Sequence, residues 1–270
     1  ASNENALGPS PKAIEAMKDV GVRMHLYPDP EAVGLRKSAA AFFRCRPEQI
    51  VAGNGSDEII DLLCRAYLEP GDEVIIPSLT FSYYRIASLV CGAQVVSASM
   101  KDNAIWADDI LERVSAKTKL IFVANPNNPT GTCLGKDEIM KLVSCIPAET
   151  LLVIDEAYAA FVREKDFIRA TDLINEHGNV VSIYTLSKSH GLAGVRIGFC
   201  VAAESVIGTL NRIKPPFNMN ILALKAGEAA LSDDEFLART LETTWQGLDY
   251  LYEQIERLGL SYIPAQTNFV

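Results

Sequence analysis

From Ile50 onward, short apolar runs alternate with amphipathic stretches, and this alternation limits the possible folds more than any other feature of the chain. The apolar runs, which predict strands, cover 50–52, 73–76, 94–98, 120–124, 151–154, 180–184 and 197–202. The helical patterns between them cover 56–68, 83–90, 108–115 and 136–143. Such alternation is typical of a parallel sheet with helices on both faces. We therefore expect an α/β fold with a mainly parallel seven-stranded sheet.

The residues before this region predict two further helices. Ser10 can cap and Pro11 can begin a helix that has Ile14 and Met17 on its inner face. A second helix should cover about 34–44. Both helices precede the first predicted strand.

After a double proline at 215–216, helical patterns cover 221–231 and 232–258. Ser232 and Glu235 have the spacing of a capping box for the second helix. A strand then begins at Tyr262 and is cut short at Val270, so we expect the chain to be C-terminally incomplete. The predicted units are an N-terminal arm and helix over 1–25, a large cofactor-binding domain over 26–214 and the start of a smaller α+β domain over 215–270.

The charge and the rarer residue types exclude several functions. A net charge of −9 offers no basic surface for nucleic acid or an anionic membrane. No apolar run is long enough to cross a bilayer, and the first residues lack a signal-peptide pattern, so we expect a cytoplasmic protein. The six cysteines form no Cys-x-x-Cys pair, and the three histidines lack ligand spacing, so we predict reduced thiols and no metal.

The loop after the predicted strand 180–184 contains Lys188, and Arg196 follows eight residues later. A lysine in such a loop can condense with an aldehyde cofactor, while the arginine and the hydroxyls of Thr185 and Ser187 hold its phosphate. Taken alone, the lysine is better explained as a solvated surface residue. Other motifs must therefore support the chemical interpretation.

Two polar motifs follow other predicted strands. Asp155 comes directly after 151–154, and a carboxylate there can hold a proton on a pyridine nitrogen while Tyr158 reaches the 3-oxygen of the ring. Alone, Asp155 is better explained as a helix cap. The turn over 125–131 contains two prolines that fix the amide of Asn128, although many polar turns have this composition.

The glycine-rich turn over 53–57 follows a strand and opens a helix, so its free backbone amides can receive a phosphate. Glu58 stands where a dinucleotide-binding fingerprint requires a third glycine, which disfavours a plain nucleotide-binding protein. Asp57 and Glu58 would repel an anion unless their side chains point away. The aromatic run over 80–84 can cover a flat ring or belong to the core.

Together and in this order, these motifs resemble the fold type I aminotransferases that use pyridoxal phosphate. The resemblance covers nearly the whole chain and is most specific at 125–131, 155–158 and 187–196. The segments that are similar to the histidinol-phosphate aminotransferase branch are 2–11, 27–29 and 53–58.

The resemblance implies that Lys188 bears pyridoxal 5'-phosphate and moves the proton between substrate and cofactor. It implies that Asp155 pairs with the pyridine nitrogen and that Asn128 and Tyr158 hold the 3-oxygen. Tyr84, or failing that Tyr83, would stack on the ring. The residues implied to hold the phosphate are Gly55, Ser56 and Asp57 through their backbone, and Thr185, Ser187 and Arg196.

The resemblance also implies a homodimer, because Tyr27 in such enzymes reaches the neighbouring subunit's site, and substrate contacts for Asn5 and Asn218. The implied reaction transfers an amino group between histidinol phosphate and 2-oxoglutarate, in histidine biosynthesis. An aminotransferase for phenylalanine or tyrosine and a phosphothreonine decarboxylase share nearly all these motifs. A regulatory module that only senses the cofactor would need a basic DNA-binding partner domain, and this acidic chain contains none.

Overall fold

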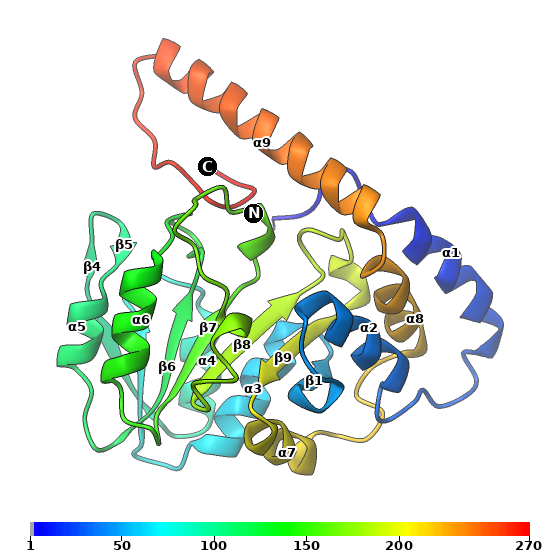
Figure 1. Ribbon diagram of the computed structural model, residues 1–270, viewed down its shortest axis with the longest axis horizontal. Coiled ribbons are helices and arrows are strands. Elements are labelled where there is room, and N and C mark those ends of the chain that lie inside the picture. The colour runs from blue at the N-terminus through cyan, green and yellow to red at the C-terminus, as the bar shows by residue number, and fades with distance from the viewer. Residues whose placement is uncertain (1–2) are drawn as a thin grey trace.

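The computed structural model describes residues 3–270 and contains a central seven-stranded sheet (Figure 1). Its strands are β1 (Ile50–Gly53), β2 (Glu73–Pro77), β3 (Gln94–Ala98), β6 (Thr118–Ala124), β7 (Leu151–Asp155), β8 (Val180–Thr185) and β9 (Gly198–Ala202). All seven correspond to predicted apolar runs. Their spatial order is β1-β9-β8-β7-β6-β2-β3. The expected α/β sheet is confirmed.

Strand β9 is the exception to the parallel arrangement, since it pairs antiparallel with both β1 and β8. The pairs β2–β3, β2–β6, β6–β7 and β7–β8 are parallel, so the expected mainly parallel character is confirmed. A short hairpin of β4 (Met100–Lys101) and β5 (Ala104–Ile105) was not predicted. Two-residue strands are too short to produce a recognisable alternation.

The helices are α1 (Pro11–Val20), α2 (Val33–Phe43), α3 (Ser56–Tyr67), α4 (Tyr83–Val90), α5 (Ala107–Glu112), α6 (Lys136–Cys145), α7 (Glu204–Ile213), α8 (Ile221–Ala230) and α9 (Asp234–Arg257). Helix α7 was not predicted, although Val206, Ile207 and Leu210 give it a buried face with helical spacing. Among residues 3–270, none of these helices has the length and apolar character needed to cross a membrane.

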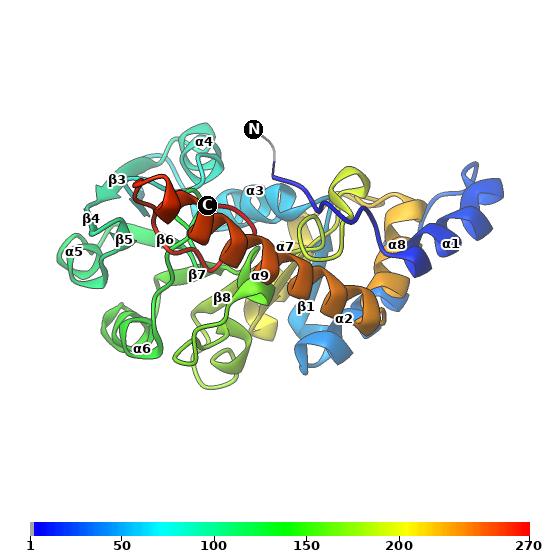
Figure 2. The same ribbon diagram turned by 90° about the horizontal axis from the view of Figure 1, so that it is seen from above.

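Both faces of the sheet carry a hydrophobic core. On one face, side chains of α2, α5, α6 and α8 pack on strand residues such as Ile121 and Val201. On the other face, α3, α4 and α7 pack on Val74 and Phe122. Figure 2 shows α3 and α4 on the opposite side of the sheet from α2 and α6. Since both faces are covered, the central strands β7 and β8 are buried along their whole length, which is why they were visible as nearly continuous apolar runs.

Three local predictions about the N- and C-terminal segments were wrong. Ile14 is 38% exposed, and Ala13 and Val20 form the buried face of α1 instead. The capping box is absent because Ser232 ends the preceding turn, where its hydroxyl donates to the Ala229 carbonyl at 2.9 Å, and Asp233 precedes α9. No strand forms at Tyr262, since residues 260–270 pair with no strand in the part of the chain described.

The predicted division of the chain at residues 25 and 214 stays a prediction. Residues 1 and 2 of the predicted N-terminal arm lie outside the described residues. Helix α8, beyond the second boundary, contributes Leu224 and Ala226 to the core that α2 shares with the sheet. Helix α9 projects away from this core (Figure 1). If a smaller domain begins in this region, α9 is the element that leads into it.

Candidate active site

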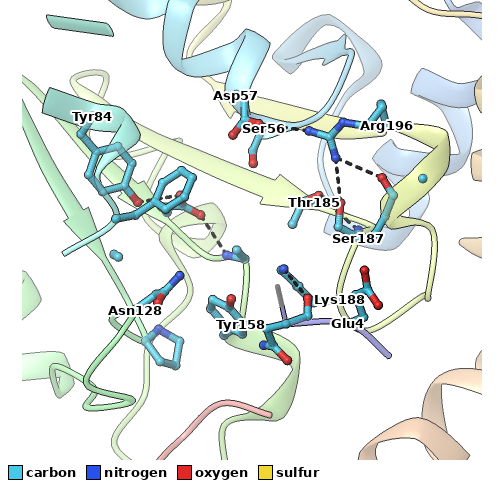
Figure 3. Close-up of a pocket in the computed structure, with 18 residues that line it drawn as sticks. Glu4, Ser56, Asp57, Tyr84, Asn128, Tyr158, Thr185, Ser187, Lys188 and Arg196 are labelled. Carbon is cyan, nitrogen blue, oxygen red and sulfur yellow. Dashed lines mark hydrogen bonds and ion pairs between the residues drawn. The ribbon is translucent and has the colours of Figure 1, made fainter. Parts of the chain in front are cut away.

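A cavity of about 370 Å³ lies where polar residues follow the carboxyl ends of β2, β6, β7 and β8 (Figure 3). Apart from Gly55, every residue predicted to hold the cofactor lines it. The lining residues are Asn3, Glu4, Ser56, Asp57, Phe81, Tyr84, Ala124, Pro126, Asn128, Asp155, Ala157, Tyr158, Thr185, Ser187, Lys188, Ala193, Gly194 and Arg196. Segments that are far apart in sequence thus meet at the carboxyl ends of the parallel strands, as expected for a ligand site in an α/β fold.

Lys188 lies in the loop between β8 and β9, and its side chain extends into the cavity. Its Nζ donates a hydrogen bond to the Asn3 carbonyl at 2.7 Å and lies 5.9 Å from the centre of the Tyr158 ring. Burial lowers the pKa of this amine, and the positive charge of Arg196 lowers it further. The amine therefore loses its proton more readily than a solvated lysine, which is the condition for its use as a nucleophile or base.

Asp155 is the last residue of β7 and is only 5% exposed. Its carboxylate accepts hydrogen bonds from the Tyr84 hydroxyl at 2.7 Å and from the Ala157 amide at 3.0 Å. Burial raises its pKa to about 6, although both hydrogen bonds act in the opposite direction. The carboxylate is thus fixed and stays mostly ionised at neutral pH, and it can attract a proton on a ligand.

Tyr84 does not have the position expected of a stacking residue. It is fully buried, and its ring stacks on Phe122 with centroids 4.8 Å apart while its hydroxyl is held by Asp155. Phe81 lines the same cavity and meets the Tyr84 ring edge-on at 5.5 Å. The geometry therefore favours Phe81 as the aromatic cover. Tyr83 donates to Asp61 at 3.0 Å and does not line the cavity.

The opposite end of the cavity contains Arg196 and the first residues of α3. Arg196 Nη2 pairs with the Asp57 carboxylate at 3.1 Å, and its Nη1 donates to the Ser187 hydroxyl at 3.5 Å. Glu58 turns away from the cavity and accepts a hydrogen bond from Asn218 Nδ2 at 2.7 Å. Only one of the two acidic side chains therefore faces the anion site, and Arg196 compensates its charge.

The turn before α6 holds Asn128 at the cavity by fixing its neighbours. Asn125 bonds the backbone of Leu134 through both ends of its amide. Asn127 donates to Leu79 O at 3.0 Å and accepts from the Thr80 hydroxyl at 2.7 Å. Because the side-chain amides of Asn125 and Asn127 are used in hydrogen bonds within the protein, Asn128 is the asparagine of this turn whose amide can bind a ligand.

Three residues predicted to contact substrate or the other subunit do not line this cavity. Asn5 donates to the Lys188 carbonyl at 3.1 Å and so supports the lysine loop from behind. Asn218 is occupied by Glu58. Tyr27 is 83% exposed and stacks on Phe217 with centroids 4.7 Å apart. Their predicted contacts stay predictions.

Asn3 and Glu4 line the cavity but were not predicted as site residues. They belong to an irregular arm, whose path no periodicity reveals. Residues 3–270 contain no group of three or more His, Cys, Asp or Glu side chains placed to hold a metal ion.

Two glycines allow close packing at the end of the cavity that contains Arg196 and the start of α3, which we call the anion end. Gly55 has a φ of +83°, and a Cβ there would collide with the Arg196 guanidinium. Gly198 opens β9 opposite Gly53, and a Cβ on it would collide with the backbone of Gly55 and Ser56. Strand β9 can approach the start of α3 only because Gly198 lacks a side chain, and the Arg196 guanidinium can approach the same turn only because Gly55 does.

We expect Gly198→Ala to lower the free energy of unfolding by about 1–3 kcal/mol, because the clash is with backbone and forces α3 away from β9. The same shift should weaken phosphate binding at the cavity. Denaturant unfolding and a phosphate titration of the variant measure the two effects. Gly208→Ala is the matched control, since a Cβ there meets nothing within 4 Å; equal behaviour of both variants would contradict the prediction.

The comparisons with known proteins agree with this geometry. The family model for aminotransferase class I and II matches residues 1–270. The chain belongs to this family. This aminotransferase is 43% identical over 270 residues to a histidinol-phosphate aminotransferase of Maricaulis maris, covering 100% of this chain and 75% of the relative. It is 38% identical over 271 residues to that of Moorella thermoacetica, covering 70% of the relative.

Solved structures also resemble this aminotransferase. A putative histidinol-phosphate aminotransferase from Erwinia carotovora atroseptica superposes with a TM-score of 0.93 at 31% identity, over 98% of this chain and 78% of the other. The enzyme from Sinorhizobium meliloti in complex with pyridoxal-5'-phosphate gives a TM-score of 0.94 at 26% identity, over 99% and 73%. The predicted family, fold type and enzyme class are confirmed.

Proposed function

We propose that this aminotransferase transfers an amino group from histidinol phosphate to 2-oxoglutarate with pyridoxal 5'-phosphate as cofactor. The observation that carries the proposal is the identity of 38–43% to histidinol-phosphate aminotransferases along the whole chain. The cavity supports it, because Lys188, Asp155 and Arg196 meet there in an arrangement that fits the cofactor. Histidine biosynthesis is the process in which we place the reaction.

The residues present fit the aldehyde, ring and phosphate of this cofactor. Arg196, Ser56, Thr185 and Ser187, with the free amides at the start of α3, would hold the phosphate. The collision that a Cβ on Gly55 would cause shows how closely the guanidinium approaches this turn.

At the other end of the cavity, Asp155 would face the pyridine nitrogen, and Asn128 and Tyr158 would hold the 3-oxygen. Phe81 would cover the ring, in place of the Tyr84 that the resemblance implied. When bound, the cofactor supplies an electron sink that stabilises negative charge on the substrate carbon.

Lys188 is the residue to which we assign both attachment and proton transfer. Its amine has a lowered pKa, so it would hold the cofactor through the aldehyde carbon. Once the donor's amine replaces it there, the freed lysine would take the α-proton of the donor and pass it to that same carbon. The two oxygens of Asp155 are fixed by Tyr84 and Ala157, and the carboxylate would hold a proton on the ring nitrogen. Asn5 and Asn3 orient the lysine, one from its carbonyl and one from its amine.

We also propose a cytoplasmic homodimer. Tyr27, which stacks on Phe217, follows closely after Val22 and Met24 in the sequence, and these two residues are 81% and 64% exposed. Exposed apolar groups on one segment favour burial against a second subunit. All six cysteines are free, as expected in a reducing compartment.

The proposed function predicts a donor-specific spectral change. The purified protein loaded with pyridoxal 5'-phosphate should show a visible absorbance band, which histidinol phosphate converts to that of the amine form of the cofactor. Adding 2-oxoglutarate should restore the first spectrum and produce glutamate. Phenylalanine, tyrosine and phosphothreonine serve as comparison substrates. If only phenylalanine or tyrosine discharges the band, or if phosphothreonine loses carbon dioxide, the proposed donor is wrong.

A further inference from the structure

The N-terminal arm places an acidic side chain at the wall of the cavity. Glu4 lines the cavity next to Asn3, whose carbonyl holds the Lys188 amine at 2.7 Å. Figure 3 shows Glu4 on one side of Lys188, with Tyr84 and Asn128 on the other. Glu4 also borders a second cavity of about 190 Å³ between the arm and α9, which Asn5, Thr240, Thr244 and Asn268 help to line. Glu4 therefore borders both cavities, on the side of Lys188 toward which a molecule bound at the lysine would extend.

Glu4 differs from the other charged residues of the cavity in having no partner among residues 3–270. Arg196 pairs with Asp57, and Asp155 accepts hydrogen bonds from Tyr84 and Ala157. No hydrogen bond or ion pair within the described residues involves the Glu4 carboxylate. Its influence on Lys188 is electrostatic, since the negative charge of Glu4 raises the pKa of the lysine against the larger effect of burial.

The position of the other groups determines which part of the donor can reach Glu4. If Arg196 holds the cofactor phosphate and Asp155 holds the ring nitrogen, the reacting carbon lies near Lys188. We place the donor's side chain toward the N-terminal arm, because Tyr84 and Asp155 are buried on the other side of Lys188 and the second cavity lies beside Glu4. Glu4 is the charged group on this path.

We propose that Glu4 is a specificity-determining residue, which accepts a hydrogen bond from an N–H-bearing or cationic ring on the amino donor. This inference rests on the proposed function and names the group that recognises the imidazole of histidinol phosphate. A carboxylate only accepts hydrogen bonds, and imidazole offers an N–H donor in either protonation state. A phenyl ring offers no donor and would leave the carboxylate unpaired when water is displaced.

The test compares two donors in three proteins. Steady-state kinetics of wild type, Glu4→Gln and Glu4→Ala are measured with histidinol phosphate and with phenylalanine, each with 2-oxoglutarate. We expect both substitutions to lower kcat/KM for histidinol phosphate by about tenfold, mainly through KM, because a charge-assisted hydrogen bond to the donor is lost. The value for phenylalanine should stay within about twofold or rise. Glu15→Gln, on the exposed face of α1, is the matched control for loss of one negative charge.

The outcomes separate this inference from the proposed function. If wild type uses histidinol phosphate but Glu4→Gln lowers kcat/KM equally for both donors, Glu4 acts only through Lys188 and the inference is wrong. It is equally wrong if neither donor is affected. If wild type transfers no amino group from histidinol phosphate, the proposed function itself fails, and the assignment of Glu4 to the imidazole fails with it.

Discussion

Replacing Lys188 with alanine is expected to lower kcat by about 10⁴-fold or more, the upper range for loss of a general base. Within residues 3–270, Lys188 is the one lysine that lines the cavity, so no neighbouring amine can take over its attachment or its proton transfer. Stopped-flow and steady-state assays measure the loss. Borohydride reduction followed by peptide mass analysis should find cofactor on the Lys188 peptide of wild type and on no peptide of the variant.

Two comparisons make the Lys188 experiment decisive. Lys37→Ala removes an exposed lysine on α2 and should leave turnover unchanged. A small primary amine in the buffer should restore part of the activity of Lys188→Ala, because it supplies the missing base in the cavity that the substitution enlarges. Turnover of Lys188→Ala within about tenfold of wild type, without added amine, would show that another group performs the chemistry.

The second large effect is expected for Asp155→Asn, which should lower kcat by about 10²–10³-fold, the loss typical of removing one preorganised electrostatic group. Asparagine keeps the size of the side chain, and its single oxygen can still accept from the Ala157 amide while its NH2 group donates to the Tyr84 hydroxyl. What it loses is the negative charge that attracts a proton on the cofactor ring. A variant that retains more than about a third of wild-type turnover would exclude this role.

The same variant should change the pH dependence of stability in the cofactor-free protein. Burial raises the pKa of Asp155 to about 6, so the folded protein keeps a proton that the unfolded chain loses near pH 4. The free energy of unfolding contributed by this group therefore falls as pH rises from about 4 to about 6, by about 3 kcal/mol. Asp155→Asn should lack this fall, which urea unfolding between pH 4 and 8 measures. Parallel curves for the two proteins would contradict it.

The strands and most candidate site residues could be predicted because burial of the sheet on both faces makes both of them visible in the sequence. Strands buried on both faces are continuously apolar, so the polar residue that ends each one is conspicuous. Asp155 ends β7 and is conspicuous for this reason, and Lys188 stands in the loop that follows β8. Helix α7 has a comparable pattern in Val206, Ile207 and Leu210 and could have been found.

Other features depend on contacts that no local pattern contains. Phe81 and Tyr84 are three residues apart, and only the packing of Phe122 on Tyr84 decides which ring covers the cavity. Asn3 and Glu4 reach the site through an irregular arm held by tertiary hydrogen bonds. The capping box at Ser232 failed because the preceding turn of α8 uses that hydroxyl first.

The antiparallel strand β9 has a consequence for the order in which the protein folds. It lies between β8 and β1, so it joins the lysine loop to the glycine turn at the start of α3. Strand β1 is made early in synthesis and has no neighbour in the sheet until residues 198–202 emerge from the ribosome. Pairing between strands that are so far apart in the sequence raises the contact order of the protein, and a high contact order slows folding. The end of the cavity that contains Arg196 is therefore complete only after β9 has paired with β1, and cofactor binding reports that this pairing has formed.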